Sequence, residues 1–160
     1  MAMEQGEIGW FSPDPRGVIP LDTFHQTKSL KRVVSSGKFE IRINSSFSEV
    51  IDGCAEREET WIDETVRESY ITLSSGGYAH SVETWFKGEL VGGLYGVSIG
   101  GAFFGESMFS REPNASKVAL VALVEHLRKR KFILLDTQWT TPHLRQFGAV
   151  DIPKNEYLSL

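Results

Sequence analysis

Residues 81–136, SVETWFKGELVGGLYGVSIGGAFFGESMFSREPNASKVALVALVEHLRKRKFILLD, decide the fold. They contain three strand patterns joined by two tight glycine turns, because glycine adopts the positive φ that such turns require. Asn114 or Ser116 then opens a long helix that is apolar almost all round in its first half, and 132–136 is a short apolar strand. A meander supplies no parallel crossover, whereas the closing strand–helix–strand step can. The stretch therefore predicts an α+β fold with a mostly antiparallel sheet flanked by helices.

The segment before this stretch predicts one strand and three short helices. Thr27 is placed to cap the first helix. Residues 38–43 alternate between apolar and polar side chains, which is typical of a half-buried strand. Ser46 and Glu49 have the spacing of a capping box that opens the second helix. A third amphipathic helix follows Trp61.

The composition is that of a single globular domain. The chain has 160 residues, 41% of them hydrophobic and 24% charged, and its formal net charge of −4 gives no strongly basic field for nucleic acid. The single cysteine, Cys54, excludes an internal disulfide framework and a multi-cysteine zinc site. No apolar run reaches membrane-spanning length, and the start lacks the pattern of a signal peptide. We expect one domain over residues 1–160 in a cytoplasmic protein without a membrane partner.

The nucleophiles and histidines form no catalytic motif. Cys54 lies on the apolar stripe of a predicted helix, which is typical of a buried inert thiol. Ser107 stands in GESMF rather than in the G-x-S-x-G elbow, and the four histidines lack metal-site spacing. The glycine run 91–96 lies inside a strand, so it is not a dinucleotide loop. Close packing and a ligand lying against bare backbone both explain this run.

Three polar residues stand in or after apolar strands. Glu106 interrupts a strand rich in aromatic residues, where a charge is costly unless it has a partner. Asp136 and Gln138 follow an apolar run, and their spacing of two places both on one face if the strand continues. All three are candidate site residues, and a structural ion pair or cap explains them equally well.

A basic cluster accompanies the first predicted helix. Lys28, Lys31, Arg32 and Lys38 have no acidic residue among them. On spacing alone, this cluster is a solvated helix face. Aromatic residues such as Trp61 would turn it into an RNA-binding edge by stacking on bases.

Seven stretches, which follow one another along the chain, carry a resemblance to a known family. They are WFSPDPRGVIPLDTFH (10–25), TWI (60–62), AHSVETW (79–85), GELVGGLYGV (88–97), FFGESMFSREPNASKVAL (103–120), LLDTQ (134–138) and FGAVDIP (147–153). Together they resemble the leucyl/phenylalanyl-tRNA–protein transferases of bacteria. SPDPR and GESMFSR are long strings of unusual composition, which makes chance a poor explanation.

The resemblance implies a fold related to the N-acetyltransferase (GNAT) superfamily. It also implies transfer of Leu, Phe or Met from aminoacyl-tRNA to the N-terminal α-amine of proteins that begin with Arg or Lys. This modification marks the acceptor for degradation by the N-end rule. The resemblance implies no metal, cofactor or prosthetic group, and we expect a monomer. An aminoacyl ester is already activated, so its attack by an amine needs positioning and polar stabilisation more than a covalent catalyst.

The resemblance also implies roles for individual residues. Asp136 and Gln138 fall on catalytic positions, where they would orient the attacking amine and the ester carbonyl. Glu106 falls where the family holds the acceptor end or supports Gln138. The implied aminoacyl pocket, which a hydrophobic core explains as well, consists of Leu94, Phe103, Leu120, Leu123, Leu127 and Leu135. The implied contacts to the terminal adenosine are Trp61 and Tyr70, and those to the acceptor-stem phosphates are Lys28, Lys31 and Arg32.

The chain departs from the family pattern in two places. The family carries a further N-terminal segment, so we expect a short or N-terminally truncated member, and its thinner basic helix predicts weaker tRNA binding. Two other functions remain open. An acyl-CoA N-acyltransferase would carry a glycine-rich pyrophosphate loop where this chain reads SREPNASK (110–117). A tRNA- or peptide-binding module without catalysis would not need Glu106, Asp136 and Gln138.

Overall fold

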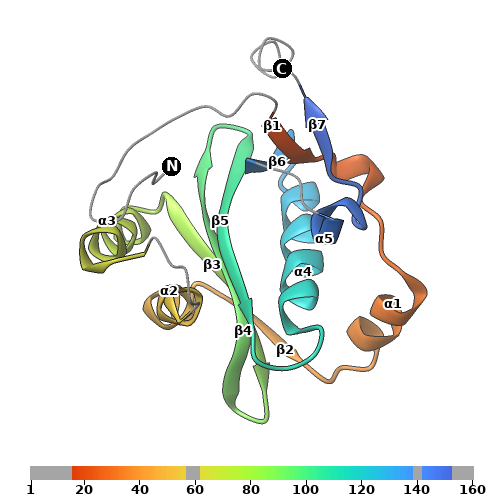
Figure 1. The fold of residues 1–160 in the computed structure, drawn as a ribbon, viewed down its shortest axis with the longest axis horizontal. Coiled ribbons are helices and arrows are strands. Elements are labelled where there is room, and N and C mark those ends of the chain that lie inside the picture. Colours follow the sequence, from red (N-terminus) through yellow and green to blue (C-terminus); the bar gives the residue numbers. More distant parts are fainter. Residues whose placement is uncertain (1–15, 57–61, 139–141, 153–160) are drawn as a thin grey trace.

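A computed structural model of the chain describes residues 16–56, 62–138 and 142–152. Within these residues, seven strands form one sheet in the order β2-β3-β4-β5-β6-β1-β7, with helices on both faces (Figure 1). The elements are β1 (Arg16–Ile19), a 3-10 turn η1 (Leu21–Thr23), α1 (Lys28–Ser35), β2 (Glu40–Ile43), α2 (Phe47–Ala55), α3 (Glu64–Ser75), β3 (Ala79–Phe86), β4 (Glu89–Ile99), β5 (Ala102–Ser110), α4 (Ala115–Lys129), β6 (Leu134–Gln138), α5 (Pro142–Arg145) and β7 (Val150–Ile152).

Each face of the sheet has its own hydrophobic core. α1 and α4 cover one face, and α2 and α3 cover the other (Figure 1). α4 supplies more residues to the larger core than any other element. Each large apolar side chain buried there stabilises the fold by about 1.5–3 kcal/mol. The smaller core gathers Phe47, Val50, Ile51 and Cys54 of α2 with Val66 and Tyr70 of α3. Among the described helices, none combines the length and the apolar character needed to cross a bilayer.

The predicted meander and the closing strand–helix–strand step are confirmed. β3, β4 and β5 pair antiparallel, and Lys87 and Gly88 make the first turn with φ of 51° and 81°. β5 and β6 pair parallel, with α4 as the crossover between them. α4 begins at Ala115, between the two predicted starting residues, Asn114 and Ser116. β6 lies two positions further along than 132–136, and Ile133, expected inside the sheet, is 67% exposed. The α+β class with a mostly antiparallel sheet is thus confirmed.

The capping box predicted at the start of α2 is wrong. The helix begins at Phe47, but the Ser46 side chain makes no cap hydrogen bond. The backbone N–H of Ser46 donates to the carboxylate of Glu83 on β3 at 2.9 Å. This buried acid therefore takes the place that the box assigns to Glu49.

The outer end of the predicted strand at 38–43 is less buried than its alternation indicates. Ile43, expected on the buried face of its strand, is 41% exposed because it ends the edge strand β2.

The sequence did not predict β1 and β7. β1 pairs antiparallel with β6 on one side and with β7 on the other. Arg128 of α4 anchors the turn that follows β1, because its Nε donates to the carbonyl of Leu21 at 2.7 Å. The two strands place β6 in the interior of the sheet, where Asp136 is fully buried.

The glycine run of β4 is explained by close packing. A Cβ on Gly92 would lie 2.6 Å from the Cβ of Ala115 at the start of α4. A Cβ on Gly96 would overlap the carbonyl oxygen of Phe104 on β5. Protein atoms therefore cover the backbone of these glycines, and of the two interpretations of the run, the structure favours packing.

Candidate active site

The sheet opens into a fork between β5 and β6. The two strands pair only where Ala102–Phe104 lies opposite Leu134–Asp136, whereas β5 continues to Ser110. The fork contains a cavity of about 870 Å³, whose walls come from α2, β4, β5, α4, β6 and α5. A cavity of this size is in the range of small-molecule sites. The fork is therefore the candidate active site.

The cavity brings together five of the predicted site residues. Leu94, Leu120, Leu123 and Leu135 line it, and so does Glu106. They come from β4, α4, β6 and β5, so the topology of the sheet gathers residues that are distant in sequence. Apolar walls with a carboxylate among them can hold an apolar side chain beside a charged or polar group.

Two residues predicted for the aminoacyl pocket lie elsewhere. Phe103 and Leu127 are each 2% exposed and belong to the larger core, and neither lines the cavity. Met108 and Leu144 line the cavity without having been predicted. Core residues and cavity-lining residues have the same composition, so sequence alone does not separate them.

Asp136 lies at the closed end of the fork. It is opposite Phe104 in the last pair of the β5–β6 ladder and is fully buried. β6 continues to Gln138, so Asp136 and Gln138 lie on one strand, and their shared face stays a prediction. The register against β1 shifts between them, which leaves Thr137 as the extra residue of a bulge. Thr137 lines the cavity.

Glu106 occupies an irregularity of its own in β5. The β4–β5 register shifts between Tyr95 and Gly96, which leaves Glu106 as the extra residue. A bulge redirects a side chain out of the regular alternation. Glu106 reaches the hydroxyl of Tyr70 on α3, with which it forms a hydrogen bond. Burial, together with the charge of Glu106 and this hydrogen bond, raises the pKa of Tyr70, so the hydroxyl stays protonated and donates to the carboxylate.

Tyr70 is thereby placed as a support of Glu106. Its ring is 5% exposed and meets the ring of Tyr95 edge-on, with 5.2 Å between centroids. In this arrangement the ring presents no open face for stacking on a base. The other residue expected to contact adenosine, Trp61, lies outside the described residues.

We expect Tyr70→Phe to lower the rate of the reaction at the fork about tenfold. The substitution keeps the ring and removes the hydrogen bond that fixes Glu106, and such a bond contributes about 1–1.5 kcal/mol. Steady-state kinetics would measure the change. Tyr78→Phe is the matched control, because Tyr78 is 59% exposed. Equal rates for both variants would contradict the role of Tyr70.

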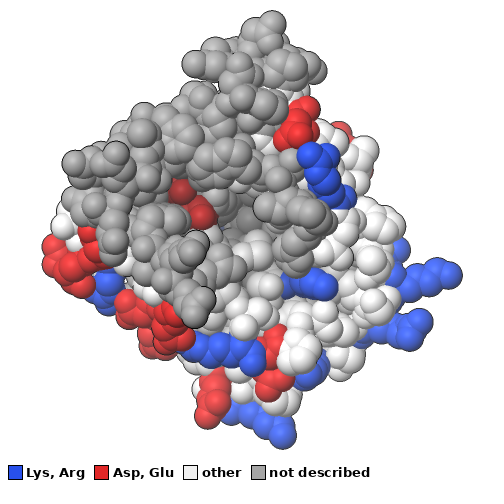
Figure 2. Space-filling model, viewed as in Figure 1, with Lys and Arg blue, Asp and Glu red and all other residues white. Residues whose placement is uncertain are grey.

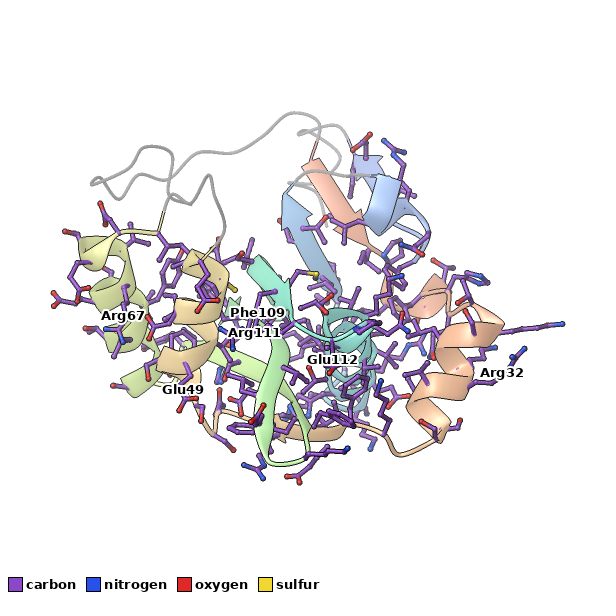
Figure 3. All side chains as sticks on the ribbon, turned by 60° about the horizontal axis from the view of Figure 1, so that its bottom comes forward. Arg32, Glu49, Arg67, Phe109, Arg111 and Glu112 are labelled. Carbon is purple, nitrogen blue, oxygen red and sulfur yellow. The ribbon has the colours of Figure 1, made fainter. Side chains whose placement is uncertain are left out.

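The predicted basic residues lie away from the cavity. Lys28, Lys31 and Arg32 are exposed on α1, and none of them lines the cavity. Figure 2 shows blue side chains over α1 on the right and red ones over α2 and α3 on the left. Figure 3 shows Arg32 on α1, far from Phe109 and Arg111 beside α2. In this view, a basic side over α1 and a mainly acidic side over α2 and α3 underlie the net charge of −4 (Figure 2).

Comparison with known proteins assigns the chain. The description of the matching family is leucyl/phenylalanyl-tRNA protein transferase, and the match covers residues 18–160. The chain belongs to this family.

Solved structures share the fold of this transferase-family chain. FemX matches with a TM-score of 0.65 at 10% identity, over 99% of this chain and 66% of that chain. L-PGS from Bacillus licheniformis matches with a TM-score of 0.53 at 15% identity, over 84% of this chain and 50% of that chain. The chain therefore spans about half the length of L-PGS.

The transferase-family chain has two features that the sequence did not reveal. Arg111 forms an ion pair with Glu56, in which one guanidinium nitrogen (Nη2) donates to both carboxylate oxygens at 2.9 and 3.0 Å, and both residues line the cavity. This pair ties the end of α2 to the end of β5. The buried hydroxyl of Tyr95, which also lines the cavity, has no hydrogen-bond partner among the described residues. Tyr95 lies in the glycine run, so the only sequence signal was a tyrosine in an otherwise apolar strand.

The side chains at the site of this transferase-family chain include carboxylates, hydroxyl groups and apolar groups. In the part of the chain that the structure describes, no group of three His, Cys, Asp or Glu side chains could hold a metal ion. The fork offers carboxylates, hydroxyl groups and an apolar cavity. Such a set can orient an amine beside an apolar acyl group by hydrogen bonding and charge.

Proposed function

We propose that the protein transfers Leu, Phe or Met from aminoacyl-tRNA to the N-terminal α-amine of proteins that begin with Arg or Lys. The observation that carries the proposal is the fork, where Glu106 lines a leucine-rich cavity and Asp136 occupies the last β5–β6 pair at its closed end. Membership of the transferase family supports it. The same proposal makes the protein a cytoplasmic monomer that marks its acceptors for N-end rule degradation, and makes residues 1–160 one catalytic domain.

The reaction needs little beyond positioning. The acceptor amine attacks the carbonyl carbon of the aminoacyl ester, a C–N bond forms, and the bond to the ribose oxygen breaks. The amine proton leaves with that oxygen as the tRNA hydroxyl. The leucine-lined cavity would hold the aminoacyl side chain, and Asp136 with Gln138 would orient the amine and the ester carbonyl. Glu106, fixed by Tyr70, would hold the acceptor amine.

The tRNA would approach from the side of α1. Lys28, Lys31 and Arg32 are exposed there without an acidic residue on the helix. In the proposal they meet acceptor-stem phosphates, whose neutralisation releases counterions. Trp61 and Tyr70 belong to the adenosine end of this proposal, Tyr70 through its hydroxyl rather than its ring.

A charge-removing variant tests the α1 contacts. We expect K28Q/K31Q/R32Q to weaken aminoacyl-tRNA binding. The slope of the logarithm of the binding constant against the logarithm of the salt concentration should become shallower by about 2, since each phosphate contact contributes about 0.7–0.9 to it. Fluorescence anisotropy over a salt series would measure both. Arg67→Gln is the control, because Arg67 pairs with Asp52 and lies far from Arg32 (Figure 3). An unchanged slope in the triple variant would contradict the contacts.

One assay decides between the proposed function and its alternatives. The protein is offered charged Leu-tRNA and a peptide that begins with Arg, and the peptide mass is followed. A gain of one leucine residue, absent when the peptide is N-acetylated, supports the proposal. No product with folded protein that still binds both substrates would favour a binding module. Product with acetyl-CoA in place of the tRNA would favour an acyl-CoA enzyme. The structure disfavours the phosphate site of such an enzyme, because the Ser116 N–H in the first turn of α4 already donates to Ser110 Oγ.

A further inference from the structure

The outer edge of β5 carries backbone groups that the sheet does not use. The N–H of Arg111 donates to the carbonyl of Val91 at 2.6 Å, directly after β5. In an antiparallel ladder, hydrogen-bonded positions alternate along the strand, so Phe109 also bonds toward β4. Met108 and Ser110 are therefore the residues whose N–H and C=O point away from β4. These groups face the fork.

On the side away from β4, neither of these residues pairs with a strand among the described residues. The pairing of β5 with β6 ends at Phe104, well before Met108. Among the described residues, the backbone N–H and C=O of Met108 and Ser110 have no hydrogen-bond partner. Both residues line the cavity. An open strand edge of this kind is a template for an added strand.

We propose that the first residues of the acceptor protein bind as a short strand, parallel to β5, on the edge formed by Met108 and Ser110. This inference rests on the proposed function and specifies how its acceptor is held. The acceptor must bring a cationic or neutral amine to Glu106 and Asp136, which lie at the inner end of this edge. An extended peptide has the backbone donors and acceptors that the edge lacks, and its terminal amine complements the charge of the two carboxylates.

The direction of the added strand follows from the position of the amine. With the amine beside Glu106, the peptide runs outward along β5 toward Ser110, and therefore parallel to it. This path covers about 13 Å, the length of four extended residues. The edge thus binds only about the first four residues of the acceptor chain.

The ladder geometry assigns each backbone group. In a parallel pair, one residue bonds to the two neighbours of the residue opposite it. The third acceptor residue, opposite Phe109, donates its N–H to the carbonyl of Met108 and accepts from the N–H of Ser110. The first acceptor residue offers its carbonyl to the N–H of Met108. The N–H of the second acceptor residue points away from β5.

Modified peptides test this assignment without altering the protein. Acceptor peptides that begin with Arg are prepared with an N-methyl group at residue 2 or at residue 3, or with an ester in place of the residue-3 amide. Transfer from Leu-tRNA is measured as kcat/KM for each peptide. We expect methylation at residue 3 to lower kcat/KM at least tenfold, and the ester to lower it about fivefold. Methylation at residue 2, the matched control, should change it less than threefold.

The outcomes separate the inference from the proposed function. Transfer to the unmodified peptide, with equal losses for methylation at residues 2 and 3, would overturn the strand on β5 while the proposed function stands. A larger loss at residue 2 than at residue 3 would also overturn it. No transfer to the unmodified peptide would overturn both. In a length series, kcat/KM should rise up to about four residues and then level off, whereas a continued rise with length would contradict an edge of this extent.

Discussion

Asp136→Asn should lower kcat/KM for aminoacyl transfer at least a hundredfold while the protein remains folded. Asp136 is fully buried at the closed end of the fork, opposite Phe104. The substitution keeps the size of the side chain and removes the charge that would orient the attacking amine. A polar group that acts in the transition state of such a site contributes about 2.7–4 kcal/mol, which corresponds to this factor.

The measurement is single-turnover transfer from Leu-tRNA to a peptide that begins with Arg. Circular dichroism and thermal melting would establish folding in parallel. Asp22→Asn is the matched control, because Asp22 is an exposed aspartate in η1 outside the cavity. Gln138→Ala, at the end of the same strand, should also slow transfer. If Asp136→Asn and Gln138→Ala both transfer at a third of the wild-type rate or better, the assignment of the catalytic centre is wrong.

Glu83→Ala should be among the most destabilising substitutions of the described residues. The carboxylate of Glu83 is fully buried and accepts hydrogen bonds from the Ser46 N–H at 2.9 Å, the Ser81 hydroxyl at 2.7 Å and the Trp85 indole at 3.2 Å. Truncation leaves three donors without their acceptor and opens a cavity, which costs about 3–5 kcal/mol. For a chain of this length the melting temperature should fall by roughly 10 °C.

Chemical and thermal denaturation would measure this loss. Glu89→Ala is the control, because Glu89 is an exposed glutamate at the start of the next strand. Its free energy of unfolding should change by less than about 0.5 kcal/mol. A loss below about 1 kcal/mol in Glu83→Ala would show that the buried network is not needed for stability.

Local patterns predicted the elements of the fold well. The turn at Lys87 and Gly88 and the start of α4 follow from glycine and from helical periodicity, and both depend on residues close in sequence. Thr27 caps α1 as predicted, accepting from the N–H of Leu30. The capping box at Ser46 failed because its donor bonds to Glu83, which is distant in sequence. β1 and β7 are short and find their partners only through the sheet.

The candidate site was harder to predict than the fold. Glu106 stood out because a charge in an apolar strand needs a partner, and the structure supplies Tyr70. Glu83 carries the same signal more weakly, because its strand also contains other polar residues. Which core leucines face the cavity depends on where β5 and β6 separate. The sequence pattern contains no sign of that point.

The pairing of β1 with β6 has a consequence for how the protein matures. Val18 lies opposite Asp136, so a contact beside the candidate catalytic centre closes a chain loop of more than a hundred residues. Contacts of such long range form late in folding, because loop closure costs entropy before the contact returns any. During synthesis, the meander can form while β6 is still inside the ribosome. The fork, and with it any activity, can arise only after β6 has emerged.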